Sequence, residues 1–288
     1  MRFLVLGCLH GQVPRLAGRY DAIICAGDFC SDAHRPAMFA ALKENLADPK
    51  KKVQWYDLVG RKEAKRLIDQ SLADGRRLLE KLNSVGVPVY VVPGNNDWPG
   101  FETDWAYEGK DHYSKLIKGL KNIVDLNHKM TDTGEHTIIG YGESSGPEYP
   151  QYEEDVRRLT KAKLAKKKTA YTRLKKEYDA LFTKAKKEGR GIILLSHNVP
   201  FDTKIDYIDN PASPRNSQHF GSILVRYLVE RHEPLVALGA HMHEHFGAVK
   251  LGRTYCVNAG YGKGCNVLLD IKGRNVERLK FIGKAHEY

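Results

Sequence analysis

The sequence predicts an α/β fold, because short apolar runs that read as buried strands alternate with longer stretches of helical spacing. Residues 2–6 and 22–25 are such runs, and residues 87–92 and 192–195 repeat the arrangement. Each run ends at a turn that carries polar, chemically versatile side chains. Uniformly apolar strands are typical of sheets covered on both faces, and their alternation with helices favours the α/β class.

The remaining elements follow from spacing and turn residues. Residues 35–45 and 57–85 carry apolar side chains at helical spacing, and Gly86-Val87-Pro88 ends the second of these helices. Further strands are expected at residues 123–124, 137–140, 235–238, 246–250, 254–258 and 266–271. We find no repeats and no flexible linker, so we expect a single domain over residues 1–288.

Residues 151–188 form a distinct segment, since neither Pro nor Gly interrupts them after Pro150. The apolar side chains fall on one narrow seam: Leu164, Tyr171, Leu174, Tyr178, Leu181 and Ala185. A continuous helix here would be about 55 Å long. We therefore expect residues 151–190 to form a basic helical arm or hairpin. Its seam packs either on the body of the protein or on a second copy, which leaves an oligomer open.

The positive charge belongs to this segment. The 288 residues carry a net charge of +11, and residues 156–190 alone hold 14 Lys or Arg against 3 acidic residues. The rest of the chain is balanced, and its 42% hydrophobic content suffices for a large core. The charge distribution therefore predicts that a polyanionic partner would bind this segment and not the rest of the chain.

The cysteines and the hydropathy pattern bear on location. Five cysteines without regular spacing predict reduced thiols and a cytoplasmic protein. No segment approaches the roughly 18 apolar residues of a membrane helix, so we expect no membrane partner. The first residues resemble a lipoprotein signal that ends at Cys8, but the apolar stretch is too short, and we interpret it as a buried strand.

Five predicted strand ends are followed by turns that join small residues to candidate metal ligands. They are Gly7-Cys8-Leu9-His10-Gly11, Gly27-Asp28, Gly94-Asn95-Asn96-Asp97, Ser196-His197-Asn198 and Gly239-Ala240-His241-Met242-His243. Glycine lets the backbone turn sharply, so that the next side chain can point into a shared cleft. Imidazole and carboxylate groups are ligands that suit Mn, Fe or Zn.

In this order, the five turns resemble the calcineurin-like metallophosphoesterase superfamily, whose pattern is D-x-H, G-D, G-N-H-[DE], a lone His and G-H-x-H. The resemblance implies a four-layer sandwich of two mixed sheets with helices outside. It also implies two divalent metal ions (Fe, Zn or Mn) that hold a bridging hydroxide in line with the leaving group. By resemblance, one metal takes Cys8, His10, Asp28 and His243, and the other takes Asp28, Asn95, His197 and His241.

Three positions depart from the family pattern. Cys8 replaces the first Asp, as in the similar turn of RNA lariat debranching enzymes, and a thiolate favours Fe(II) or Zn over Mg. Asn96 replaces a His that protonates the leaving group or stabilises charge on the phosphate. This replacement favours a phosphodiesterase over a monoesterase. Ala240 separates Gly239 from the His pair, a change that we expect the site to tolerate.

The remaining candidate site residues are less closely tied to the pattern. Asn96 is a candidate phosphate contact, and Asp97 is expected to orient the Asn95 turn. His219 precedes a predicted helix N-terminus near Ser222, where it is a candidate acid or phosphate contact. Lys166, Lys167, Lys168 and Arg173 are candidate nucleic-acid contacts, the alternative being a solvated helix face.

We therefore expect a metal-dependent phosphodiester hydrolase that acts on a nucleotide or nucleic-acid phosphodiester. RNA or a nucleotide is the candidate partner of the basic helix. Two alternatives stay open. One is an inactive metal-binding scaffold that binds RNA or a protein, and the other is a phosphomonoesterase with His219 as its acid.

Overall fold

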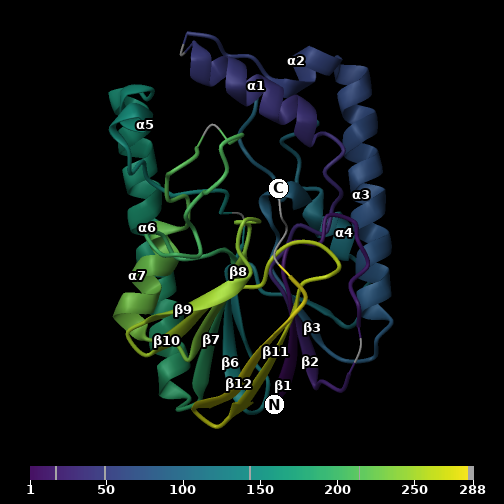
Figure 1. Cartoon of the computed structure of the whole chain (residues 1–288), viewed down its shortest axis with the longest axis vertical. Helices are drawn as coiled ribbons and strands as arrows, with labels where there is room; N and C mark the ends of the chain where they lie inside the picture. Colours follow the sequence, from purple (N-terminus) through teal and green to yellow (C-terminus); the bar gives the residue numbers. More distant parts are fainter. Residues whose placement is uncertain (17, 49, 143, 214, 285–288) are drawn as a thin grey trace.

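Two mixed six-stranded sheets pack face to face with helices on their outer faces in the computed structural model (Figure 1). The structure describes residues 1–16, 18–48, 50–142, 144–213 and 215–284. The last four residues of the predicted domain thus lie outside the described part. The first sheet has the strand order β12 (Asn275–Ile282), β11 (Asn266–Lys272), β1 (Arg2–Leu6), β2 (Ala22–Cys25), β3 (Val89–Val91), β4 (Ile123–Asp125).

The second sheet also has six strands, with one antiparallel strand at each edge. Its order is β5 (Lys129–Asp132), β6 (His136–Tyr141), β7 (Gly191–Asn198), β8 (Val236–Ala240), β10 (Thr254–Asn258), β9 (Gly247–Leu251). In each sheet four neighbouring strands run parallel, β1 to β4 in the first and β6, β7, β8 and β10 in the second. Parallel strands end at the same edge of a sheet, so the turns that follow them gather at one end of the molecule.

The apolar runs predicted as strands form the core between the sheets. Phe3, Val5 and Ile24 of the first sheet meet Ile193 and Leu238 of the second, all fully buried. Both faces of the parallel strands are covered, which explains why their sequences show continuous apolar runs and no alternation. The predicted four-layer architecture is confirmed.

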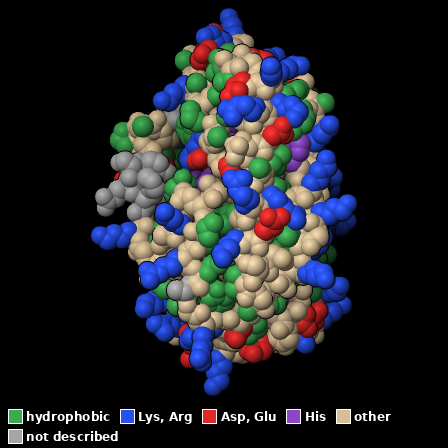
Figure 2. Space-filling model, turned by 90° about the vertical axis from the view of Figure 1, so that its right-hand side faces the viewer, with side chains coloured by type: hydrophobic (Ala, Val, Ile, Leu, Met, Phe, Trp, Pro, Cys, Tyr) green, Lys and Arg blue, Asp and Glu red, His purple; other side chains and the backbone are tan. Residues whose placement is uncertain are grey.

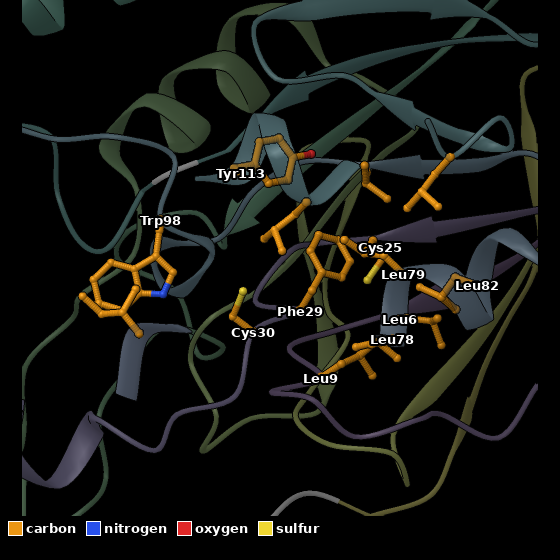
Figure 3. Packing of buried hydrophobic residues seen from close by; sticks show 14 of the residues in the cluster. Leu6, Leu9, Cys25, Phe29, Cys30, Leu78, Leu79, Leu82, Trp98 and Tyr113 are labelled. Carbon is orange, nitrogen blue, oxygen red and sulfur yellow. The ribbon is translucent and has the colours of Figure 1, made fainter. Parts of the chain in front are cut away.

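Helices cover the outer face of the first sheet. They are α3 (Arg61–Asn83) and α4 (Tyr113–Ile117), while α1 (Arg35–Ala47) and α2 (Trp55–Val59) lie above the strands at the top of Figure 1. Part of the cluster beneath them is drawn in Figure 3, where Phe29 lies among Cys25, Leu79 and Tyr113. The predicted helix over 57–85 is divided at Gly60, whose φ of +80° leaves the helical region between α2 and α3.

The second sheet is covered by α6 (Lys161–Lys187) and α7 (Ile223–His232), and the short α5 (Glu153–Arg157) precedes α6. Tyr178 and Ala185 of the predicted seam are buried against this sheet, together with the neighbouring Phe182. Residues 161–187 therefore form one helix that packs along the body, because the seam needs an apolar surface to cover it.

Two strands have no counterpart in the sequence prediction. β5 and β12 are edge strands with alternating or partial burial, so they lack the apolar runs that identified the others.

All five cysteines are buried free thiols. On the face that carries α3, Lys and Arg side chains are spread among acidic ones without forming a continuous patch (Figure 2). Within the described residues, no helix combines the length and apolar character that a membrane crossing requires.

Candidate metal centre

The carboxyl ends of five strands bring the candidate ligands together. Cys8 and His10 follow β1, Asp28 follows β2, and Asn95 opens the short 3-10 helix η1 (Asn95–Asp97) after β3. His197 lies within β7, where the register to β8 shifts between Leu195 and Asn198. Such an irregularity re-aims a side chain at the end of a strand. His241 and His243 follow β8.

One group of potential ligand atoms comes from Cys8, His10, Asp28 and His243, whose atoms all lie within 4.8 Å of one another. His10 Nε2 lies 3.3 Å from His243 Nε2 and 3.4 Å from Asp28 Oδ2. The Cys8 Sγ accepts a hydrogen bond of 3.1 Å from the backbone N–H of His241. All four residues are buried.

A second group comprises Asp28, His197 and His241. His197 Nε2 lies 3.1 Å from His241 Nδ1 and 3.6 Å from Asp28 Oδ2. Asn95 joins this group, because its Oδ1 lies 3.0 Å from the same His197 nitrogen. Asp28 thus belongs to both groups. The structure brings all seven predicted ligands together in the grouping that the family resemblance implies, while their binding of metal stays a prediction.

The protonation states of this donor set suit a divalent cation. Burial, followed by the neighbouring His197, lowers the pKa of His241 to about 3, so its ring is neutral at pH 7. Burial likewise lowers the pKa of His243 well below its usual value. Burial and then the charge of Asp28 raise the pKa of the Cys8 thiol, so a thiolate there requires a nearby cation. The neutral rings of His241 and His243 join one carboxylate and one thiol in a donor set that fits Fe or Zn.

The backbone is strained at three of these ligands. His10, Asp28 and His241 have φ values of +45°, +55° and +66°, in the left-handed region that residues with a side chain seldom adopt. Outliers of this kind cluster at functional sites. The turns also approach closely, since a Cβ on Gly94 would lie 2.0 Å from Asp28 Oδ1. Glycine at position 94 is therefore a steric requirement of the site.

Asp97 ties two of the turns together. Its carboxylate accepts backbone hydrogen bonds from Asp28 (2.7 Å), Phe29 (2.7 Å), Cys30 (3.0 Å) and Gly94 (2.8 Å). Burial and the charge of Asp28 raise the pKa of Asp97 to about 7, while these N–H donors act in the opposite direction. The contacts agree with the predicted role of Asp97 in orienting the loops.

Backbone carbonyls position two of the histidines. His197 Nδ1 lies 2.7 Å from the carbonyl oxygen of Ala26, which directs Nε2 towards Asn95 and Asp28. The ring of His241 is hydrogen-bonded by the backbone of Ser145 in the same way. These contacts fix which ring nitrogen faces the cluster.

Asn96 lies beside the first group. Its backbone N–H donates to Asp28 Oδ1 at 2.8 Å, and its side-chain nitrogen lies 3.3 Å from His10 Nδ1. The same nitrogen also lies within 3.4 Å of the carbonyl oxygens of Cys30 and Ser31. The amide is therefore held in place at the position where the family carries an imidazole.

His219 lies away from both groups. Its Nδ1 is 2.8 Å from Asp206 Oδ1, and its ring packs 5.2 Å from that of Tyr207. His219 and Tyr207 line a separate cavity together with Asp202 and Lys204. The structure does not bring His219 into the cluster, and its role as an acid stays a prediction.

The four candidate nucleic-acid residues on α6 separate into two sets. Lys167 and Arg173 line a cavity of about 480 Å³ between α6 and residues 144–148. Lys166 instead pairs with Glu102 at 2.6 Å, and Lys168 is exposed. A larger cavity of about 780 Å³ lies at the opposite end of the second sheet, and none of the seven candidate ligands lines it.

Two residues near the cluster escaped the sequence analysis. Arg35 Nη1 lies 3.5 Å from His243 Nδ1, and the ring of Tyr261 packs 4.3 Å from that of His243. Arg35 opens α1 and Tyr261 follows β10, so neither belongs to a turn with a ligand pattern. No spacing in the sequence pointed to them.

Comparisons with known proteins decide the family. A family model described as calcineurin-like phosphoesterase matches residues 1–245. The chain belongs to this family. The predicted resemblance is thereby confirmed, and the protein is a metal-dependent phosphoesterase. No curated protein sequence matches the chain.

Two solved structures, with TM-scores above 0.5, share the fold of this phosphoesterase. One crystal structure has 16% identity and a TM-score of 0.58, with 98% of each chain covered. A candidate 5'-nucleotidase from Staphylococcus aureus, solved with alpha-ketoglutarate, has 12% identity and a TM-score of 0.53. That match covers all of this chain but 55% of the nucleotidase. The protein TT1561 of Thermus thermophilus has 18% identity, 98% coverage of both chains and a TM-score of 0.47.

Proposed function

We propose that this phosphoesterase hydrolyses phosphodiesters of nucleotides or nucleic acids at a dinuclear metal centre. Cys8, His10, Asp28 and His243 would hold one metal, and Asp28, Asn95, His197 and His241 the other. Metals bound there would supply a hydroxide nucleophile and stabilise negative charge on the phosphoryl oxygens. We also propose that residues 1–288 form a single domain, since β1 and β11 pair in one sheet.

The observation that carries the preference for diesters is Asn96. An amide cannot transfer a proton at neutral pH, so this residue offers no acid to a leaving alkoxide. Its side-chain nitrogen also lies near the carbonyls of Cys30 and Ser31 and is not free to move. Without this acid, charge on a leaving alkoxide would have to be stabilised by the metals, and we take the change as support for a diester over a monoester.

The other side chains have positioning and electrostatic roles. Asp97 holds the turns of Asp28 and Asn95 in register through four backbone hydrogen bonds. The guanidinium of Arg35 lies beside His243 at the start of α1. A cation at this place would stabilise the charge that develops on a phosphoryl oxygen.

The proposal is tested by metal analysis and hydrolysis together. We expect two metals per chain after loading with Mn, Fe(II) or Zn, and turnover of bis-(p-nitrophenyl) phosphate that exceeds turnover of p-nitrophenyl phosphate. His197→Ala removes a candidate ligand and should abolish turnover. His232→Ala serves as the matched control, because His232 ends α7 and lines the cavity at the opposite end of the sheet.

The same measurements distinguish the alternatives. Faster release of phosphate from the monoester would favour a phosphomonoesterase, an activity that the similarity to a candidate 5'-nucleotidase makes worth testing. Bound metal without turnover of either ester under any loading would favour the scaffold. Either result would overturn the diesterase proposal.

A further inference from the structure

We propose that a single-stranded nucleic acid reaches the metal centre through a cationic groove, in which Lys167 and Arg173 bind a backbone phosphate next to the scissile one. The groove is the cavity between α6 and residues 144–148, together with the rim at Phe101. The inference rests on the proposed diesterase function and specifies its substrate class.

The metal centre is open on one side. Cys8, His10, Asp28, His197 and His243 are buried, whereas Asn95 and His241 are partly exposed. Both exposed residues belong to the second group of candidate ligands. A substrate therefore reaches the metals from the side of Asn95 and His241.

The cationic cavity adjoins this open side. The backbone of Ser145 hydrogen-bonds the ring of His241, and Ser145 also lines the cavity of about 480 Å³. Lys167 and Arg173 of α6 line the same cavity. The loop that contains Ser145 thus lies between His241 and the two cations. A nucleic-acid chain that extends from the metals along this loop comes within reach of Lys167 and Arg173.

The charges in the cavity favour an anion. Among the described residues, no ion pair involves Lys167 or Arg173. The acidic residue in the cavity wall is Glu148, whose carboxyl accepts hydrogen bonds from Tyr141 and Ser222. Burial raises the pKa of Glu148 above its usual value. Two cations that form no ion pair with the described residues, in a partly enclosed space, are suited to a phosphate.

An exposed aromatic ring lies on a loop that contacts α6. Phe101 follows the Asn95 turn, is 46% exposed and stacks on Trp98. The next residue, Glu102, pairs with Lys166 and so places this loop beside α6. Exposed aromatic rings next to cations bind single strands, because a base can stack on the ring while the backbone phosphate meets the cations.

The experiment measures binding of a short fluorescent single-stranded oligonucleotide to the full-length protein by anisotropy, in ribo and deoxy form. We expect Lys167→Glu with Arg173→Glu to weaken binding at least tenfold. The slope of log affinity against log salt, taken between roughly 50 and 200 mM, should fall by about 0.7 for each lost phosphate contact. Phe101→Ala should weaken binding roughly tenfold and leave the salt slope unchanged.

The matched control is Lys176→Glu with Lys184→Glu, which makes the same charge change at exposed positions of α6 outside the cavity. Equal losses in both double variants, or no binding by the unaltered protein, would overturn the proposal. Lys167→Ala with Arg173→Ala should reproduce the loss without charge reversal, and circular dichroism checks the fold of each variant.

Failure of this inference and of the diesterase function are distinguishable. The binding experiment needs no turnover, and bis-(p-nitrophenyl) phosphate carries no second phosphate for Lys167 and Arg173 to bind. We therefore expect the double variant to keep its turnover of the small diester while its KM for the oligonucleotide rises. A parallel fall in kcat on the small diester would contradict a role confined to the groove.

Discussion

At the scale of single residues, Asp28 connects the two groups of candidate ligands. Its Oδ2 lies near nitrogens of both His10 and His197, while its Oδ1 accepts the backbone N–H of Asn96. Burial alone would raise the pKa of Asp28, but the neighbouring His197 and His10 hold it well below its usual range. The carboxylate is thus ionised, which is the state that bridges two cations.

Replacing the sulfur ligand should change the choice of metal. Cys8→Asp substitutes a hard oxygen for a soft thiolate, so we expect the ratio of bound Mn to bound Zn to rise. The ratio is measured by elemental analysis after loading from an equimolar mixture, and circular dichroism confirms folding. An unchanged ratio would count against ligation by Cys8, whose Sγ now accepts from His241.

Asp97→Asn should destabilise the protein without removing any candidate ligand. Asparagine keeps one acceptor oxygen and turns an N–H₂ group towards the N–H groups that Asp97 now satisfies. We expect the free energy of unfolding to fall by about 3 kcal/mol, measured with urea. Asp104→Asn, at an exposed position, is the control and should be nearly neutral. A neutral Asp97→Asn would mean that these hydrogen bonds contribute little.

At the scale of elements, the N-terminus of α7 is held by two side chains. The hydroxyl of Ser222 accepts the N–H of Val225 at 3.0 Å, and Glu148 accepts the N–H of Leu224 at 3.1 Å. Ser222 also donates to Glu148 at 2.5 Å. This contact joins the loop that lines the cationic cavity to the helix behind it.

Glu148 should make stability depend on pH. Its pKa in the folded state is raised above the usual value of 4.5 by burial, so the folded protein binds a proton more tightly than the unfolded chain. This contribution is fully present below about pH 4.5 and is lost as the pH rises through the raised pKa. Glutamine does not titrate, so we expect Glu148→Gln to lose less stability than the unaltered protein as the pH rises. Between pH 4 and 7, the free energy of unfolding of Glu148→Gln should therefore rise relative to that of the unaltered protein.

Urea unfolding of both proteins across this pH range gives the comparison. Glu277→Gln is the control, because Glu277 is exposed on β12. A parallel pH dependence of Glu148→Gln and the unaltered protein would show that Glu148 does not titrate in this way.

At the scale of the whole molecule, the metal centre joins the two sheets. The first sheet supplies Cys8, His10, Asp28 and Asn95, and the second supplies His197, His241 and His243. A bound cation therefore links the halves of the sandwich at one end. Lys167 and Arg173 of α6 line the cavity that adjoins this end of the molecule.

Removal of metal should lower the melting temperature. A ligand present at a hundred times its Kd stabilises the folded state by about 2.7 kcal/mol. For a chain of this size we expect chelation to lower Tm by about 5 °C or more in calorimetry. The shift should shrink in His197→Ala, and an equal shift there would place the relevant metal elsewhere.

By itself, the sequence determined the strands of the core and the order of the candidate ligands. Buried parallel strands need continuous apolar runs, and the turns after them need glycine beside a side chain that points into the cleft. Both requirements are local, so they are visible in residues such as Gly27 and Asp28 or Gly94 and Asn95. The periodicity of the α6 seam predicted that it packs either on the body of the protein or on a second copy. The structure shows the seam packed on the body.

Only the tertiary structure decided the surroundings of these residues. Edge strands such as β5 lack apolar runs, and the approach of Arg35 to His243 joins positions 208 residues apart. Likewise, the sequence could not separate Lys167 and Arg173, which line the cavity, from Lys166, which pairs with Glu102. The physical reason is that contacts between distant segments depend on how the elements pack, and they leave no local pattern in the chain.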